Sequence, residues 1–106
     1  MAKIVLKELV KEIKETWEVR DIAFANDTAL RIAKIEGAYD WHIHQKEDEF
    51  FLVLKGKIFI DTEEKAVELN EMEGFLVKRG TKHRSRADEA AWVLLVEPTR
   101  TKTMGE

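Results

Sequence analysis

The sequence predicts an all-β domain preceded by one short helix. Apolar residues recur at helical spacing near the N-terminus, but from residue 17 onward apolar and polar residues alternate with a period of two. Turn-forming residues interrupt the alternating part at short, fairly regular intervals, which is typical of a β-sandwich or barrel. We therefore expect a helical segment at 1–16, a single β-domain at 17–98 and a polar, less ordered tail at 99–106.

The N-terminal segment has the pattern of an amphipathic helix over roughly residues 4–16. Its apolar face consists of Leu6, Leu9, Val10, Ile13 and Trp17. Lysine and glutamate residues occupy the opposite face. Such a helix packs its apolar side on the body of the protein or on a partner subunit.

Short strands are expected at 18–25, 29–36, 49–54, 57–62, 65–69, 74–78, 82–87 and 91–97. The turn-type sequence Asn26-Asp27-Thr28 joins the first two, and Lys55-Gly56 is a hairpin signal between the next two. The only proline, Pro98, follows the last strand, where it does not interrupt a ladder.

The strand at 49–54 is apolar on both faces, whereas a strand with one wet face alternates more cleanly. Its outward side chains, Phe50, Leu52 and Leu54, therefore need cover. The N-terminal helix, a second sheet or another subunit would each supply it.

Composition excludes several classes of protein. The formal net charge is 18 − 21 = −3 without a basic block, so we expect no nucleic-acid partner. No apolar run approaches the roughly 20 residues that span a bilayer, and charges interrupt the N-terminus too often for a secretory signal. We therefore expect a cytoplasmic protein without a membrane partner.

The chain has no cysteine, which excludes disulfides, thiol catalysis and thiolate zinc sites. A metal site would need nitrogen and oxygen ligands. Amides are also scarce, with only Gln45, Asn26 and Asn70, while lysine and glutamate are abundant. This balance is weakly typical of a thermophilic source.

The three histidines lie where one metal site would need them. On a strand, His42 and His44 point to the same side, and residues 45–48 can turn the chain so that Glu49 joins them from an adjacent strand. His83 would have to arrive from a distant strand. Three nitrogens and one oxygen leave one or two coordination positions open. An HxH pair alone, however, is more often a surface or core feature than a pair of ligands.

These residues resemble the first motif of the cupin family, G(X)5HXH(X)3-4E(X)6G. Gly37, His42, His44, Glu49 and Gly56 match it, with the first gap one residue short. The second motif, G(X)5PXG(X)2H(X)3N, is matched at Gly80 and His83. It departs at three positions, where the chain has Met72, Lys78 and Ala87. The resemblance covers about residues 35–98. Within the family, the sequence resembles small single-domain cupins of the mannose-6-phosphate isomerase-like type. That label concerns fold and not activity.

The resemblance implies a jelly-roll barrel, also called a double-stranded β-helix, with a mononuclear metal near one mouth. The implied ligands are His42, His44, Glu49 and His83, and the metal is a divalent transition ion: Zn, Fe, Mn, Ni or Cu. The family commonly forms homodimers, which would cover the doubly apolar strand. It also implies a small organic molecule as ligand.

Strand alternation then predicts which residues line the cavity. Phe51 and Val53 share the side of Glu49, and Ser85 and Ala87 share the side of His83. Arg84 and Arg86 point away. They favour a solvated face that pairs with acids such as Asp88 and Glu89 over an anion site. Trp17, Trp41 and Trp92 are expected to anchor the core or an interface.

Two functions follow from this site. The first is a metal-dependent enzyme acting on a small organic molecule, for example a dioxygenase or an isomerase. The second is a non-catalytic module that binds or senses a small molecule in the same cavity. No general acid or base stands out beyond the ligands, so no catalytic residue is assigned.

Overall fold

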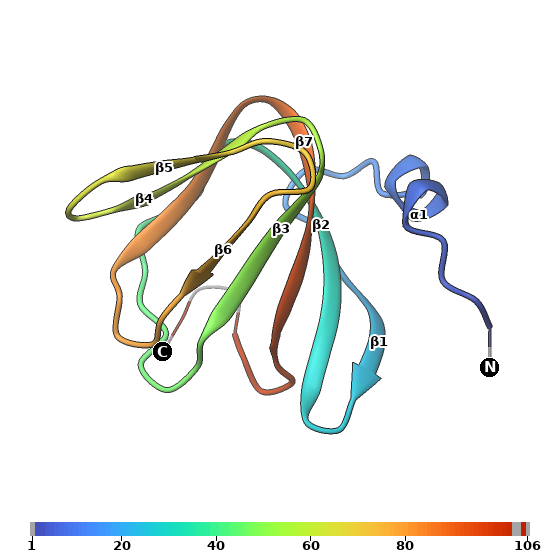
Figure 1. Cartoon of the computed structure of the whole chain (residues 1–106), viewed down its shortest axis with the longest axis horizontal. Helices are drawn as coiled ribbons and strands as arrows, with labels where there is room; N and C mark the ends of the chain where they lie inside the picture. Colours follow the sequence, from blue (N-terminus) through green and yellow to red (C-terminus); the bar gives the residue numbers. More distant parts are fainter. Residues whose placement is uncertain (1, 103–104, 106) are drawn as a thin grey trace.

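The computed structural model describes residues 2–102 and residue 105. Within that part of the chain, one helix is followed by seven strands (Figure 1). The elements are α1 (Leu6–Glu12), β1 (Val19–Ala25), β2 (Thr28–Ala38), β3 (Glu49–Lys55), β4 (Ile58–Thr62), β5 (Ala66–Leu69), β6 (Gly74–Val77) and β7 (His83–Pro98). No helix among the described residues is long enough to cross a membrane.

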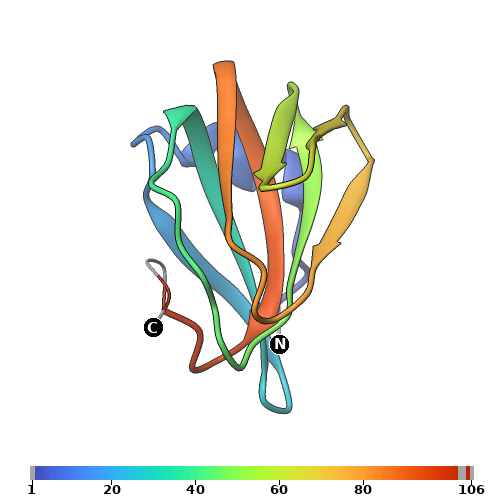
Figure 2. The same ribbon diagram turned by 90° about the vertical axis from the view of Figure 1, so that its left-hand side faces the viewer.

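All strand pairs are antiparallel, and the main path runs in the order β1-β2-β7-β3-β6. Strand β4 pairs with β5 and with β7, off this path. The strands lie around a common interior, as the two views at right angles show (Figures 1 and 2). The expected all-β jelly-roll barrel with a short N-terminal helix is therefore confirmed.

The strands expected at 82–87 and 91–97 are one continuous strand, β7, and the break between them was wrong. Asp88 and Glu89 are charged and exposed and Ala90 is partly buried, but none of the three is glycine or proline. The ladder with β2 passes from Ile35–Ala91 to Gly37–Ala87, so the extra residues form an irregularity and not a turn. As a result, one half of β7 pairs with β3 and the other half with β4.

The helix is shorter than the predicted 4–16. It ends where Ile13 takes an extended conformation, with φ −85° and ψ 100°. Ile13 is fully buried, and its carbonyl oxygen accepts a hydrogen bond from Trp92 Nε1 at 2.8 Å. Trp17 has a positive φ of 69° and leaves the helical face altogether. Tertiary packing therefore overrides the helical spacing of the last two apolar residues.

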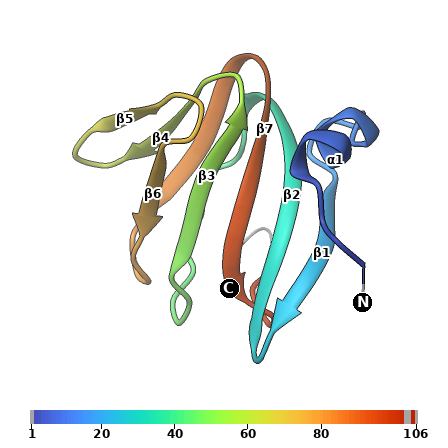
Figure 3. The same ribbon diagram turned by 45° about the vertical axis from the view of Figure 1, so that its right-hand side comes forward.

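Helix α1 covers part of the outer face of the sheet (Figure 3). Val10, Ile13 and Ile32 form a buried cluster, against which Leu54 and Trp92 pack. The doubly apolar strand β3 is thus covered at Leu54 by the helix. Phe50 and Leu52 stay partly exposed on the same outer face.

The larger core cluster fills the barrel interior and includes the fully buried Val53, Ile58, Ile60 and Val93. The first residues after Pro98 are tied to this body. The Thr99 N–H donates to the Asp27 carbonyl oxygen at 2.9 Å, and Thr101 is buried. Residues 1, 103, 104 and 106 of the expected helical segment and tail lie outside the described residues.

Candidate metal centre

Four side chains that could ligate a metal converge at one end of the barrel. They are His42, His44, Glu49 and His83, and one ligand atom from each lies within 4.8 Å of the others. Glu49 and His83 are the first residues of β3 and β7. His42 and His44 lie in the segment between β2 and β3, where His42 forms only an isolated bridge and not the expected regular strand.

Backbone pairing brings the distant residue His83 to this segment. The N–H groups of His42 and His83 donate to each other's carbonyl oxygens, both at 3.0 Å. The N–H of Gly80 donates to the His44 carbonyl oxygen at 2.8 Å. The segment that contains the HxH pair is thus fixed against the start of β7 at two points.

Carbonyl oxygens fix two of the imidazole tautomers. Nδ1 of His42 lies 2.8 Å from the Asp40 oxygen, and Nδ1 of His83 lies 2.9 Å from the Thr81 oxygen. Because a carbonyl only accepts, each Nδ1 carries the hydrogen and each Nε2 keeps a free lone pair. Asp48 takes no part in this, since its Oδ1 accepts the backbone N–H of Arg79 at 2.8 Å.

The facing atoms lack partners in the described part of the protein. Oε1 of Glu49 lies 3.6 Å from Nε2 of His44 and 3.4 Å from Nε2 of His83. These three atoms and Nδ1 of His44 are buried without a hydrogen bond. Buried polar atoms in this state are costly unless something binds them. A donor set of imidazole nitrogens and a carboxylate oxygen fits a divalent transition metal.

Burial also favours the neutral imidazoles that a metal needs. Loss of solvent lowers the pKa of His42 and of His44, and this outweighs the opposing effect of Glu49. Both rings are therefore neutral around pH 7, so a metal does not have to displace protons from them.

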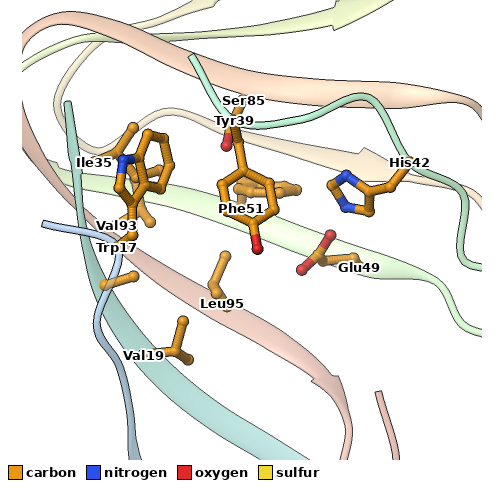
Figure 4. Close-up of a pocket in the computed structure, with 11 residues that line it drawn as sticks. Trp17, Val19, Ile35, Tyr39, His42, Glu49, Phe51, Ser85, Val93 and Leu95 are labelled. Carbon is orange, nitrogen blue, oxygen red and sulfur yellow. The ribbon is translucent and has the colours of Figure 1, made fainter. Parts of the chain in front are cut away.

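A small cavity of about 50 Å³ opens beside the site (Figure 4). Its walls are mainly apolar, with polar groups from Tyr39, His42, Glu49 and Ser85. The full lining consists of Trp17, Val19, Ala33, Ile35, Tyr39, His42, Glu49, Phe51, Ser85, Val93 and Leu95. A water needs only about 10–15 Å³ on this scale, so the cavity suits a few water-sized groups.

Of the four residues expected to line a cavity, Phe51 and Ser85 lie in the wall of this one. Val53 and Ala87 do not reach it; both are buried in the core cluster. Each lies two residues further along its strand than Phe51 or Ser85, and so further from the metal-ligand end of the barrel.

Trp17 and Tyr39 line the cavity and were not foreseen as site residues. Their ring centroids are 5.0 Å apart, and the Tyr39 ring meets the His42 ring edge-on at 5.6 Å. The left-handed backbone at Trp17, which aims its ring at the cavity, has no signal in the sequence. Burial, together with the charges of Asp40 and Glu49, raises the pKa of Tyr39, so its hydroxyl keeps its proton near neutral pH.

A second, more polar cavity of about 260 Å³ adjoins the first. The two share Val19, Glu49 and Leu95 in their walls. The additional residues of the second are Asp21, Arg31, Glu97, Thr101 and Lys102. Burial, together with the adjacent Glu49, raises the pKa of Glu97 to about 8.

Arg84 and Arg86 point away from both cavities, as expected. Their hydrogen-bond partner is Asp61, however, and not Asp88 or Glu89. Both Nε atoms contact Asp61 Oδ2, and the guanidinium groups lie over the Trp41 and Phe59 rings. Because both arginines already pair with this buried carboxylate, the structure does not favour an anion site at this position.

Comparison with known proteins agrees with this geometry. The family model for the cupin domain matches residues 30–97. An uncharacterised protein, YdbB, from Bacillus subtilis is 35% identical over 100 residues, which is 93% of this chain and 88% of YdbB.

Solved structures show the same fold. A cupin-2 domain protein from Shewanella frigidimarina superposes with a TM-score of 0.87 at 28% identity, covering 90% of this chain and 93% of that one. A Neisseria meningitidis protein gives a TM-score of 0.83 at 26% identity, over 92% and 99% of the two chains.

Proposed function

The chain belongs to the cupin family, and on that premise we propose that it binds one divalent transition metal and uses it to hold a small organic molecule. The ligands in this proposal are His42, His44, Glu49 and His83. The observation that carries it is the group of four donor atoms within 4.8 Å, of which those of His44, Glu49 and His83 are buried without partners. Such a metal would supply Lewis-acid or redox chemistry, depending on which ion is bound.

The chain's own residues shape what the centre can accept. The apolar walls favour a small ligand with little charge, while Tyr39 and Ser85 each offer a hydroxyl group to orient it. Trp17 and Phe51 provide flat apolar surface and keep water out of the inner end. An enzymatic role, as a dioxygenase or an isomerase, is our first candidate because the proposed ligand set leaves open coordination positions.

The alternative is a non-catalytic module that binds or senses a small molecule. The small number of polar groups in the cavity favours it. Metal identity separates the two candidates in part. Iron or manganese in protein purified without chelator supports redox or oxygen chemistry, whereas zinc or nickel is compatible with both roles.

The metal proposal is tested by elemental analysis of protein purified without chelator. Wild type should contain close to one ion per chain, and His44→Ala should contain far less. Ser85→Ala is the matched control, because Ser85 lines the cavity without belonging to the ligand group. Equal metal content in wild type and His44→Ala would overturn the proposal.

We also propose that the protein forms a homodimer through the outer face of its sheet. Register pairs Leu30 with Val96, Val96 with Phe50 and Phe50 with Leu76, which gives an apolar row across four strands. None of the four is fully buried, and Leu76 is 41% exposed. Light scattering should report twice the chain mass of 12.3 kDa, and Phe50→Glu should halve the value. A wild-type mass of one chain at micromolar concentration would refute the dimer.

A further inference from the structure

Trp17 stands at the end of the small cavity that lies away from the candidate metal ligands. Its ring contacts the Tyr39 ring, which in turn meets the His42 ring, with centroid distances of 5.0 and 5.6 Å. Figure 4 shows Trp17 and His42 on opposite sides of Tyr39, and all three line the cavity. The Trp17 side chain also packs against the core cluster while it stays partly exposed. The indole therefore separates this end of the cavity from solvent.

The backbone at Trp17 has a conformation that disfavours a bulky side chain. Its φ of 69° lies in the left-handed region, which glycine adopts without steric cost and tryptophan rarely adopts. Such outliers persist only where the surrounding structure holds them, and they cluster at ligand-binding and active sites. A glycine at this position would avoid the strain but would leave the end of the cavity open.

Hydrogen bonds attach the segment before β1 to the sheet and so fix the position of the ring. The Trp17 N–H donates to the Lys34 carbonyl oxygen at 2.8 Å, and Lys34 Nζ donates to the Lys14 carbonyl oxygen at 3.1 Å. Nearby, Trp92 Nε1 donates to the carbonyl oxygen of the buried Ile13 at 2.8 Å. Because Lys34 lies on β2 and Trp92 on β7, two strands of the barrel hold this segment in place.

We propose that Trp17 determines which ligands fit the metal centre, by limiting the length of the apolar part that can extend away from the metal. This inference rests on the proposed metal site. The cavity measures about 50 Å³, and Ile35 and Val93 line it beside Trp17. The ligand class is therefore a small molecule with one metal-binding polar group and an aliphatic part of a few carbon atoms. Trp17 contacts that aliphatic part and is not itself in the metal-ligand group.

The test uses linear carboxylates, from acetate to hexanoate, as probes of protein loaded with Co²⁺. Their carboxylate group can bind the ion, which changes its visible absorption, and their chain then extends into the apolar cavity. Each methylene that becomes buried should tighten binding by about fourfold. In wild type this gain should stop after the first few members of the series, because Trp17 blocks longer chains. In Trp17→Gly the gain should continue to longer acids.

Met72→Gly is the matched control. Met72 also has a left-handed backbone, with a φ of 66°, but its side chain is 72% exposed and does not line the cavity. This substitution relieves the same kind of backbone strain without changing the cavity wall. It should therefore keep the wild-type limit on ligand length.

The outcomes separate this inference from the proposed function. Failure of folded wild type to bind Co²⁺ refutes the proposed function itself. The same length limit in wild type and Trp17→Gly, or no carboxylate binding by either Co²⁺-loaded protein, overturns the role of Trp17 and leaves the metal site intact. Should Trp17→Gly fail to fold, Trp17→Leu keeps an apolar contact with the core and shortens the side chain; an unchanged limit in that variant also overturns the proposal.

Discussion

His42 and His83 are joined by two reciprocal backbone hydrogen bonds, each 3.0 Å long. This isolated antiparallel bridge places the first and last candidate ligands side by side. Their ring centroids are 4.4 Å apart, and each Nδ1 is held by a carbonyl oxygen two residues upstream. Backbone groups of the protein therefore contribute directly to the arrangement of these two candidate ligands.

Metal binding should stabilise the folded protein, because the ligand atoms come together only after folding. Free metal at about 100 times its dissociation constant should add about 2.7 kcal/mol to the free energy of unfolding. Chemical denaturation of metal-free and metal-loaded protein measures this increment. His83→Gln should abolish it and Ser85→Ala should keep it. An equal increment in His83→Gln would show that the metal binds elsewhere.

Asp61 should make stability depend on pH in the acid range. Burial opposes its ionisation, but the hydrogen bonds and charges of Arg86 and Arg84 outweigh that effect and lower the pKa of Asp61 below 3.8. A carboxyl group with a depressed folded pKa contributes stability above its unfolded pKa and loses it as pH falls through the folded value. Asp61→Asn should therefore cost about 1–3 kcal/mol at pH 7.

The difference between wild type and Asp61→Asn should begin to narrow as the pH falls below about 4, because Asp61 of the unfolded chain then takes up a proton. It should be lost only when the pH has fallen through the lower pKa of the folded protein. Urea denaturation at several pH values measures it. Asp88→Asn is the control: it removes an exposed acid from β7, the strand that carries Arg84 and Arg86, and should change stability by less than about 0.5 kcal/mol. A constant difference between pH 7 and pH 3 would contradict the assignment.

Gly56 should tolerate no side chain, for two separate reasons. Its φ of +91° disfavours L-residues, and an added Cβ would lie 3.0 Å from the Ala91 Cβ and 3.1 Å from the Ala90 carbonyl oxygen. Gly56→Ala should destabilise the protein by more than about 1 kcal/mol. Gly80→Ala is a matched control, since Gly80 has a φ of +80° but nothing within 4 Å of the added atom. Equal losses in thermal denaturation would mean that packing at Gly56 contributes nothing.

Local patterns predicted those parts of the fold that depend on neighbours in sequence. Alternation identified the strands around residue 50 and the side of each that faces inward. The spacing of His42, His44 and Glu49 corresponds to a short loop that brings these three side chains together. The position of His83 depends on pairing between distant segments. Only the resemblance to a family, and not the residues themselves, could suggest it.

The errors arose where tertiary contacts decide the conformation. Asp88 and Glu89 have the polarity of a turn, but the residues before and after this segment pair with neighbouring strands, and β7 stays continuous. Trp17 continues a helical pattern, yet its positive φ directs it to the cavity. Glu97 stands near a strand end, where a carboxylate is usually solvated; its burial beside Glu49 comes from the register of β3 and β7 and from the docked C-terminal residues.

Arg100 should stabilise the loop that connects the candidate ligands. Its Nε donates to Glu47 Oε2 at 2.9 Å, and the Glu47 side chain is only 1% exposed although it lies between His44 and Glu49. Removing one partner of such a pair leaves a buried carboxylate uncompensated. Because Arg100 itself is largely exposed, we expect Arg100→Ala to cost about 1–3 kcal/mol, as measured by urea denaturation.

A neutral side chain at position 47 should reduce the loss of stability caused by Arg100→Ala, because an amide costs less to bury without a partner than a carboxylate does. Glu47→Gln combined with Arg100→Ala should therefore be more stable than Arg100→Ala alone. Arg79→Ala is the control, because Arg79 is an exposed arginine in the loop between β6 and β7. Its free energy of unfolding should stay within about 0.5 kcal/mol of the wild-type value. Equal stability of the Arg79 and Arg100 variants would show that Glu47 is satisfied in another way and that the C-terminal residues do not support the ligand loop.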